Sequence, residues 1–260
     1  MENLHFDYYM RIKYSQTVEK CHYTIKCIPA DTDMQKLEHM EITFEPSCNP
    51  VQDTDSFGNR LLFGNIDVSH DEFIYNIKGN VKTGLADSEA IGRSQNTGMY
   101  KYPHGLAVPG NAIKSYYDKI KLQSASDYGQ AVSMMHRLHQ DFIYEKNVTD
   151  IKTTAEEAFL MGRGVCQDYS HILVALCRLA GIPARYVTGM LIGEGYSHAW
   201  VEVLINERWY GLDPTNDIVV TDSHIKIGNG RDAADCMINK GLITGGGNQT
   251  QMVRVNVERE

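Results

Sequence analysis

The spacing of apolar residues changes along this 260-residue chain, and the change limits the folds that it can adopt. The first third contains short runs rich in Ile, Val, Tyr and Phe, separated by turn-forming residues at 29–31 and 46–50. Short strands at such intervals predict an antiparallel β-sandwich. The predicted strands are Phe6–Tyr14, Val18–Cys27, His39–Phe44, Arg60–Val68 and Glu72–Val81.

Helical spacing dominates the middle of the chain. Thr154 and Glu157 form the pattern of a capping box for a short helix that Gly162 can end. A longer helix follows, and Gly181-Ile182-Pro183 is a strong signal for its end. The predicted helices cover 111–121, 127–144, the stretch between Thr154 and Gly162, and 166–180.

Three strands are predicted after these helices, at Ala184–Leu191, His198–Ile205 and Arg208–Asp213. The two residues at 206–207 predict a tight hairpin between the last two strands. Helices followed by antiparallel strands indicate an α+β fold, and the length of the chain allows two domains. We therefore predict a β-sandwich domain over 1–85, a connecting region over 86–125 and an α+β domain over 126–260.

The composition argues against several classes of function. The formal net charge is -8 with no Lys/Arg-rich run, whereas proteins that bind nucleic acids normally carry a basic stripe. No apolar stretch approaches the roughly 18 residues that cross a membrane, and the N-terminus lacks the pattern of a secretory signal. No two cysteines form a C-x-x-C pair, so we predict no metal or cofactor and a reduced, cytoplasmic setting. The cysteines are Cys21, Cys27, Cys48, Cys166, Cys177 and Cys236.

Cys166 stands where a thiol becomes reactive, because it opens the last predicted helix just after a glycine-containing stretch at 162–165. The first N–H groups of a helix lack intrahelical partners and carry the positive end of its dipole, which stabilises a thiolate. The same groups can hold the oxyanion of a tetrahedral intermediate. A buried structural cysteine is the alternative, but the position favours a nucleophile.

His198 and Asp213 lie on the two strands that the tight turn joins. In that pairing Trp200 faces Asp213, so Asp213 is a diagonal neighbour of His198 on the same face of the sheet. A slip of one residue would send Asp213 to the opposite face. This register predicts an imidazole–carboxylate pair that could act with Cys166, although each residue alone could be structural.

Four motifs in order carry a resemblance to the bacterial branch of the transglutaminase-like superfamily. They are Gly164–His171, Gly181–Val187, Ser197–Val203 and Asp213–Asn216. Residues 230–232 and the turn at Asp55–Asn59 are similar to further segments of that branch. The resemblance implies a papain-related catalytic domain in which Cys166, His198 and Asp213 form the catalytic triad.

Two features of animal cross-linking enzymes are missing from the sequence. Those enzymes place a tryptophan upstream of the cysteine, whereas Trp200 and Trp209 both follow Cys166 here. Residues 53–55 also lack the acidic spacing of a calcium loop and are typical of a turn. Calcium-switched cross-linking is therefore not expected.

Several neighbouring residues are weaker candidates. Gln167 could contact substrate or oxyanion, or simply fill the first helical turn, and Trp200 could line the site or belong to the core. His171 should point away from the thiol, which favours a packing or hydrogen-bonding role. Asp168 and Arg185 are predicted to form a structural ion pair.

The predicted activity is hydrolysis of an amide or peptide through a thioester acyl-enzyme, with a peptide or protein as substrate. One alternative is a protein-glutamine gamma-glutamyltransferase, in which a primary amine intercepts the same thioester. A second alternative is a non-catalytic peptide-binding module. Zinc held by Cys166, His198 and Asp213 is a further chemical option, because all three are legitimate ligands.

Overall fold

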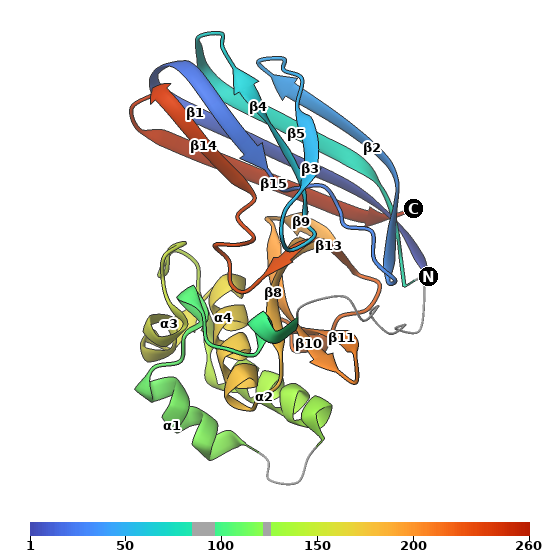
Figure 1. Ribbon diagram of the computed structural model, residues 1–260, viewed down its shortest axis with the longest axis vertical. Coiled ribbons are helices and arrows are strands. Elements are labelled where there is room, and N and C mark those ends of the chain that lie inside the picture. Colours follow the sequence, from blue (N-terminus) through green and yellow to red (C-terminus); the bar gives the residue numbers. More distant parts are fainter. Residues whose placement is uncertain (85–96, 122–125) are drawn as a thin grey trace.

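In the computed structural model, which describes residues 1–84, 97–121 and 126–260, a strand-rich layer lies against a mixed layer of helices and strands (Figure 1). The arrangement is α+β, as predicted. Part of the predicted connecting region, at 86–96 and 122–125, lies outside the described residues. The rest of that region forms η1 (Thr97–Tyr100), η2 (Gly105–Ala107) and α1 (Asn111–Ile120).

The first sheet is antiparallel and has eight strands. They are β1 (Glu2–Ile25), β2 (Gln35–Glu45), β3 (Val51–Thr54), β4 (Arg60–Ile66), β5 (His70–Thr83), β9 (Gly193–Gly195), β14 (Asn239–Gly245) and β15 (Gln249–Arg259). Strand β1 is central, because its residues 2–14 pair with β5 and β15 while residues 18–25 pair with β4 and β14.

The two strands predicted at 6–14 and 18–27 are therefore one strand, whose pairing shifts register between residues 13 and 18. The prediction of two strands was wrong because the exposed residues 15–17 interrupt the alternation without ending the strand. Tyr23, on the second part of β1, contacts Phe44 and Phe73, with ring centroids 5.8 and 5.2 Å apart. These contacts bring two parts of the sheet together. The two layers expected of a sandwich are therefore connected parts of one sheet.

The C-terminal residues also belong to this sheet. Strands β14 and β15 pair with β1, although the sequence-based division placed residues 126–260 together in the second domain. These pairs join the two ends of the chain, and Glu260 N–H donates to the carbonyl oxygen of Asn3. A domain boundary at a single sequence position cannot describe a sheet that both ends of the chain form.

The second sheet has the order β12-β11-β10-β8-β13. Its strands are β8 (Ala184–Leu191), β10 (His198–Ile205), β11 (Arg208–Asp213), β12 (Ile218–Val219) and β13 (His224–Gly230). The three predicted strands are confirmed. So is the hairpin, because Asn206 and Glu207 have positive φ angles of 49° and 65° and Ile205 pairs with Arg208.

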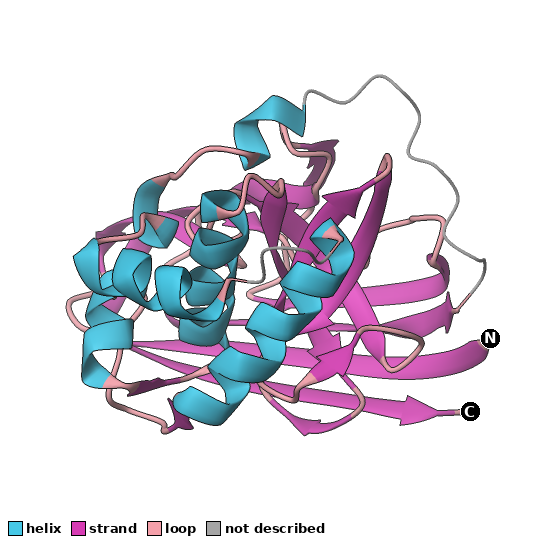
Figure 2. Ribbon diagram, turned by 90° about the horizontal axis from the view of Figure 1, so that it is seen from below, coloured by secondary structure: helices cyan, strands magenta, loops and turns pink. Residues whose placement is uncertain are grey.

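The helices gather on one side of the second sheet, which Figure 2 shows from below. The described α-helices after α1 are α2 (Asp127–Asp141), α3 (Ala155–Met161) and α4 (Cys166–Leu179), and β6 (Ile143–Tyr144) pairs with β7 (Arg163–Gly164) nearby. Helix α4 packs against β8 and β10. The predicted capping box of α3 and its end at Gly162 are confirmed. Ser126 caps α2, and its side chain accepts the N–H of Gly129. None of the described helices combines the length and apolarity needed to cross a membrane.

The two sheets share a core. Met190, Ile225 and Ile227 of the second sheet are fully buried among side chains of the first. Asn59, in the turn before β4, exchanges two hydrogen bonds of 2.8 and 2.7 Å with the backbone of Asn229. These contacts hold β13 in place beside β8, and β13 carries part of the site described next.

Candidate active site

His198 and Asp213 form the pair that the strand register predicts. His198 begins β10 and Asp213 ends β11, and Nε2 of His198 lies 2.7 Å from Oδ2 of Asp213. The Asp213 carboxylate is fully buried, while the His198 side chain keeps 11% of its surface exposed. Because Nε2 faces the carboxylate, Nδ1 is the ring atom left for another partner.

Cys166 lies near this imidazole. It is the first residue of α4 and is partly exposed, and together with Asp213 it raises the pKa of His198. The N–H groups of Asp168 and Tyr169 donate to the carbonyl oxygen of Val165, so those of Cys166 and Gln167 precede the helix's own bonds. The structure therefore places this thiol near the hydrogen-bonded pair of His198 and Asp213.

Gly164 allows the Asp168 side chain to approach the backbone just before α4. A Cβ atom at this position would lie 2.4 Å from Oδ2 of Asp168, which is too close for any real contact. That oxygen accepts the backbone N–H of Val165 at 2.8 Å and the Thr149 hydroxyl at 2.7 Å. A buried carboxylate thus fixes the first turn of the helix, directly beside the thiol.

Asp213 is held by more donors than the sequence suggested. Its Oδ2 atom is also 3.1 Å from Nε2 of His224 and accepts Nδ2 of Asn216 at 2.7 Å, while Oδ1 accepts the N–H groups of Thr215 and Asn216. His224 is fully buried on β13, and its Nδ1 faces the Ser223 hydroxyl at 3.0 Å. Asn216 lies in a motif noted in the sequence, but nothing local marked His224.

These contacts set the charges of the pair. Burial would raise the pKa of Asp213, but hydrogen bonds from His198 and His224 and the charge of His198 hold it well below its usual value. Burial would lower the pKa of His198, but Asp213 and Cys166 raise it to about 10. At neutral pH the carboxylate is therefore ionised and the imidazole is protonated.

Trp200 does not line the site, contrary to one of the two predictions for it. It is 1% exposed and its ring lies 6.3 Å from that of His198 and 5.2 Å from that of His224. The absence of a side chain at Gly189 makes room for it, since a Cβ there would lie 2.4 Å from the indole. Trp200 thus supports the two imidazoles from within the core.

Gln167 remains at the surface of the site. Its side chain is partly exposed, and Nε2 donates to the carbonyl oxygen of Asp150 at 3.3 Å. His171 is buried and accepts the N–H of Ala233 at 3.1 Å, which confirms the packing role predicted for it. Burial lowers the pKa of His171 to about 3, so its ring is neutral.

The predicted ion pair between Asp168 and Arg185 was wrong. Arg185 instead pairs with Glu202 at 2.6 Å, and Lys226 contacts the same carboxylate at 2.7 Å. Arg185 and Glu202 are direct cross-strand partners on β8 and β10, whereas Asp168 lies on the helix that covers the other face. The guanidinium group of Arg185 also stacks on Trp209, 3.9 Å from the ring centroid.

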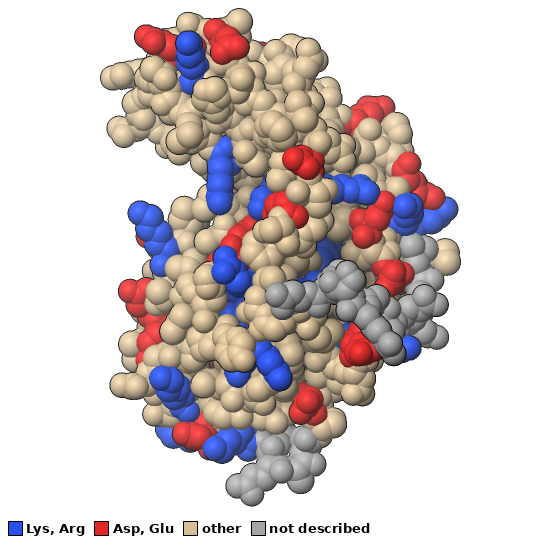
Figure 3. Space-filling model, viewed as in Figure 1, with Lys and Arg blue, Asp and Glu red and all other residues tan. Residues whose placement is uncertain are grey.

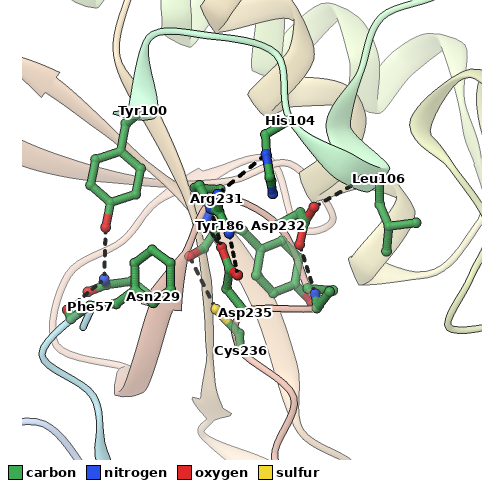
Figure 4. A network of polar contacts seen from close by, with 12 residues as sticks. Phe57, Tyr100, His104, Leu106, Tyr186, Asn229, Arg231, Asp232, Asp235 and Cys236 are labelled. Carbon is green, nitrogen blue, oxygen red and sulfur yellow. Dashed lines mark hydrogen bonds and ion pairs between the residues drawn. The ribbon is translucent and has the colours of Figure 1, made fainter. Parts of the chain in front are cut away.

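A network of polar contacts holds the segment after β13 (Figure 4). The guanidinium group of Arg231 donates two hydrogen bonds to the Asp235 carboxylate, at 2.8 and 3.0 Å. The Asp232 carboxylate accepts the N–H of Leu106 at 3.0 Å. The turn that these bonds hold places Cys236 next to Tyr186, to whose carbonyl oxygen its thiol donates. Cys166 packs against the buried cluster of Tyr186, Ala199 and Cys236.

The side chains of His198, Asp213 and His224 do not have the geometry of a zinc site in this structure. His198, Asp213 and His224 are suitable ligand types, with ligand atoms within 4.8 Å of one another. Two ligands on one tetrahedral zinc lie roughly 3.3 Å apart, because each bond is about 2.0–2.1 Å long. The 2.7 Å contact between His198 and Asp213 is shorter, so the geometry is that of a hydrogen-bonded network.

A groove of about 1590 Å³ opens beside the thiol. Its lining includes Gln167, Tyr186 and Ser197, which adjoin Cys166 and His198, and it extends along the folded first sheet. Figure 3 shows the corresponding hollow at the left of the molecule, between the strand-rich layer and the helices. Tyr144 lies near the thiol and Tyr196 lies near Tyr144, and these tyrosines are 47% and 64% exposed.

This arrangement can carry out acyl transfer. It combines a thiol at a helix N-terminus, an imidazole that can move a proton, and a buried carboxylate that orients the imidazole. The free N–H groups at the start of α4 can stabilise a developing oxyanion.

Two family models match the chain. Residues 114–214 match the transglutaminase-like superfamily, and residues 4–82 match the bacterial transglutaminase-like N-terminal region. The first match contains Cys166, His198 and Asp213. The second covers the strands of the first sheet up to β5.

Curated relatives are similar over less than half of their length. An uncharacterized protein of Mycobacterium leprae is 36% identical over 126 residues, which cover 45% of this chain and 45% of the relative. A protein-glutamine gamma-glutamyltransferase of Pseudomonas aeruginosa is 26% identical over 130 residues, or 44% of this chain and 20% of the relative.

The fold as a whole matches a solved structure. A candidate cysteine protease from Cytophaga hutchinsonii superimposes with a TM-score of 0.81 over 100% of this chain and 91% of that one. The sequences are 20% identical, so the likeness concerns the fold. It includes both the strand-rich layer and the helical part.

Proposed function

The chain belongs to the transglutaminase-like superfamily, and we propose that it is a cysteine-dependent amide hydrolase that acts through a thioester acyl-enzyme. One observation carries the proposal: the imidazole of His198 is hydrogen-bonded to Asp213, and Cys166 is close enough to raise its pKa. The name of the Cytophaga hutchinsonii protein, a candidate cysteine protease, points in the same direction.

The reaction begins when the Cys166 thiolate attacks the carbonyl carbon of an amide. The N–H groups at the start of α4 stabilise the oxyanion, and the protonated His198 gives its proton to the departing nitrogen. The products of this half are a free amine and a thioester on Cys166. His198 then takes a proton from water, which attacks the thioester and releases a carboxylic acid.

Asp213 keeps the imidazole in its working orientation. Its contact with Nε2 leaves Nδ1 free to act on the sulfur, and its negative charge stabilises the protonated ring. His224 and Asn216 hold the carboxylate in turn, which makes them positioning residues.

A test of the proposal compares Cys166 with Cys48, the other partly exposed cysteine of the described residues. Iodoacetamide at pH 7 should alkylate Cys166 much faster, because burial raises the pKa of Cys48. Cleavage of a peptide library, followed by mass spectrometry, should cease in Cys166→Ala and continue in Cys48→Ala. Undiminished cleavage by Cys166→Ala would falsify the proposal.

Amine transfer is the second candidate, since the Pseudomonas aeruginosa relative is named as a protein-glutamine gamma-glutamyltransferase. The two activities share the thioester and differ only in whether water or an amine resolves it. A glutamine peptide incubated with a labelled primary amine distinguishes them. Label incorporated faster than free acid is formed would favour transfer over hydrolysis.

A further inference from the structure

The groove beside the thiol has a free strand edge on one wall. Among the described strands β14 pairs only with β1, so the backbone groups on its other edge have no strand partner. Residues 239–243 of β14 all line the groove. An unpaired edge can bind an extended polypeptide as an additional strand.

The register of β14 shows which of its groups are available. The N–H of Lys26 donates to the carbonyl oxygen of Ile238, which makes this a hydrogen-bonded pair of the antiparallel ladder. Such pairs alternate with non-hydrogen-bonded ones. Asn239, Gly241 and Ile243 therefore direct their N–H and C=O groups away from β1, to the free edge.

The lining of the groove is unusually poor in charge. The chain contains 33 acidic and 25 basic residues, yet among the described lining residues there is no Asp, Glu or Arg and one Lys, Lys240. A charged side chain in such surroundings would lose hydration, and Lys240 is the one Lys, Arg, Asp or Glu among the described lining residues that could act as a counter-charge.

Apolar side chains are exposed along the same groove. Phe63, Ile151, Met237 and Leu242 line it, and their exposed fractions are 39, 67, 37 and 76%. Clusters of exposed apolar residues mark surfaces that bind other molecules. Apolar groups of a partner would cover them.

We infer that the acyl donor is an extended, uncharged polypeptide segment with apolar side chains, bound as an added strand along β14. The inference rests on the proposed function, because the groove leads to Cys166. Residues 239–243 could pair with about five residues of substrate, or roughly 16 Å of strand. The strand pairing would fix the register, and the thiol would attack the amide that this register brings to it.

Peptidyl acyloxymethyl ketones test the substrate class, because they alkylate an active-site thiol after binding. We compare a neutral probe of Ala, Val and Leu with probes that carry two glutamates or two lysines. Intact-mass measurement of labelling at Cys166 should show the neutral probe reacting at least about tenfold faster than either charged one. Equal rates for all three would overturn the assignment.

Leu242→Glu and Leu160→Glu form a matched pair. Both leucines are mostly exposed, at 76 and 70%, but Leu160 lies on α3 and does not line the groove. Leu242→Glu should slow labelling by the neutral probe about tenfold, whereas Leu160→Glu should leave it unchanged. Equal effects of the two substitutions would contradict the assignment.

Methylation of single backbone nitrogens in the neutral probe tests the strand pairing. Rates should fall at alternate positions only, because every second N–H of an antiparallel strand faces its partner. Labelling rates that fall without this alternation would overturn the pairing.

Iodoacetamide separates the substrate assignment from the proposed function. Rapid alkylation of Cys166 with no preference among the peptide probes would contradict the substrate assignment alone. An unreactive Cys166 would contradict the proposed function as well.

Discussion

His224 contacts Asp213, with 3.1 Å between its Nε2 atom and the Oδ2 oxygen of the carboxylate. That oxygen is also the one that His198 contacts, at 2.7 Å. His224 comes from β13, a strand on the far side of β8 from β10, so the carboxylate ties three strands of the sheet together. The position of Asp213, and through it that of His198, depends on a residue outside the proposed triad.

Replacing His224 should therefore slow catalysis without removing it. The His224→Phe variant loses one donor to a carboxylate that keeps several others, and one such hydrogen bond contributes about 1–2 kcal/mol. We expect kcat/KM to fall about tenfold while the pH optimum shifts. His224→Gln, which can still donate, should recover much of the rate. Equal activity in both variants and wild type would show that His224 only fills space.

Asp213→Asn should have a larger effect. The amide cannot stabilise a protonated imidazole, so the pKa of His198 should fall from about 10 towards its ordinary value. We expect kcat/KM to decrease by about 100-fold or more, and the alkylation of Cys166 by iodoacetamide at pH 7 to slow. Asp118→Asn, at an exposed carboxylate of α1, is the control and should behave as wild type.

Features fixed by local chemistry could be predicted from the sequence. The hairpin at 206–207, the start of α4 at Cys166 and the end of α3 at Gly162 all depend on residues within one or two turns. Because the hairpin fixes the register, the contact between His198 and Asp213 followed from it. A site assembled on a helix start and a tight hairpin is thus readable from sequence.

Features that depend on distant pairing could not be predicted in this way. His224 and Lys226 alternate with Ile225 and Ile227, which is typical of a strand with one solvent-exposed face, yet all seven residues of β13 are buried. The period of two in β15 is visible in the sequence, yet its partner is β1, more than 200 residues away. The position of His224 beside Asp213 follows only once β13 is placed next to β8.

The His198 contact should also make stability depend on pH. The pKa of His198 is raised from 6.5 to about 10 in the folded protein, so its contribution is complete below pH 6.5 and is lost as the pH rises towards 10. One proton bound only in the folded state changes the free energy of unfolding by about 1.4 kcal/mol per pH unit.

Urea unfolding of Cys166→Ala and of the double variant Cys166→Ala/His198→Gln between pH 7 and 8 isolates this contribution, because neither protein carries the thiol. Cys166→Ala should lose up to about 1.4 kcal/mol relative to the double variant across that unit. The window ends at pH 8 because burial lowers the pKa of Lys226 to about 8, and the loss of its proton has the opposite effect above that value. A constant difference between the two proteins would contradict the raised pKa.

Asn59 should prove important for stability although it is far from the thiol in the sequence. It is 3% exposed, and its amide satisfies both the N–H and the C=O of Asn229 on β13. Asn59→Ala leaves these two buried groups without partners, which we expect to cost about 2–4 kcal/mol in the free energy of unfolding. Asn65→Ala, at an exposed position on β4, should change it by less than about 0.5 kcal/mol. If urea titration gives equal midpoints for the two variants, the contact between the turn at 55–59 and β13 does not hold the two sheets together.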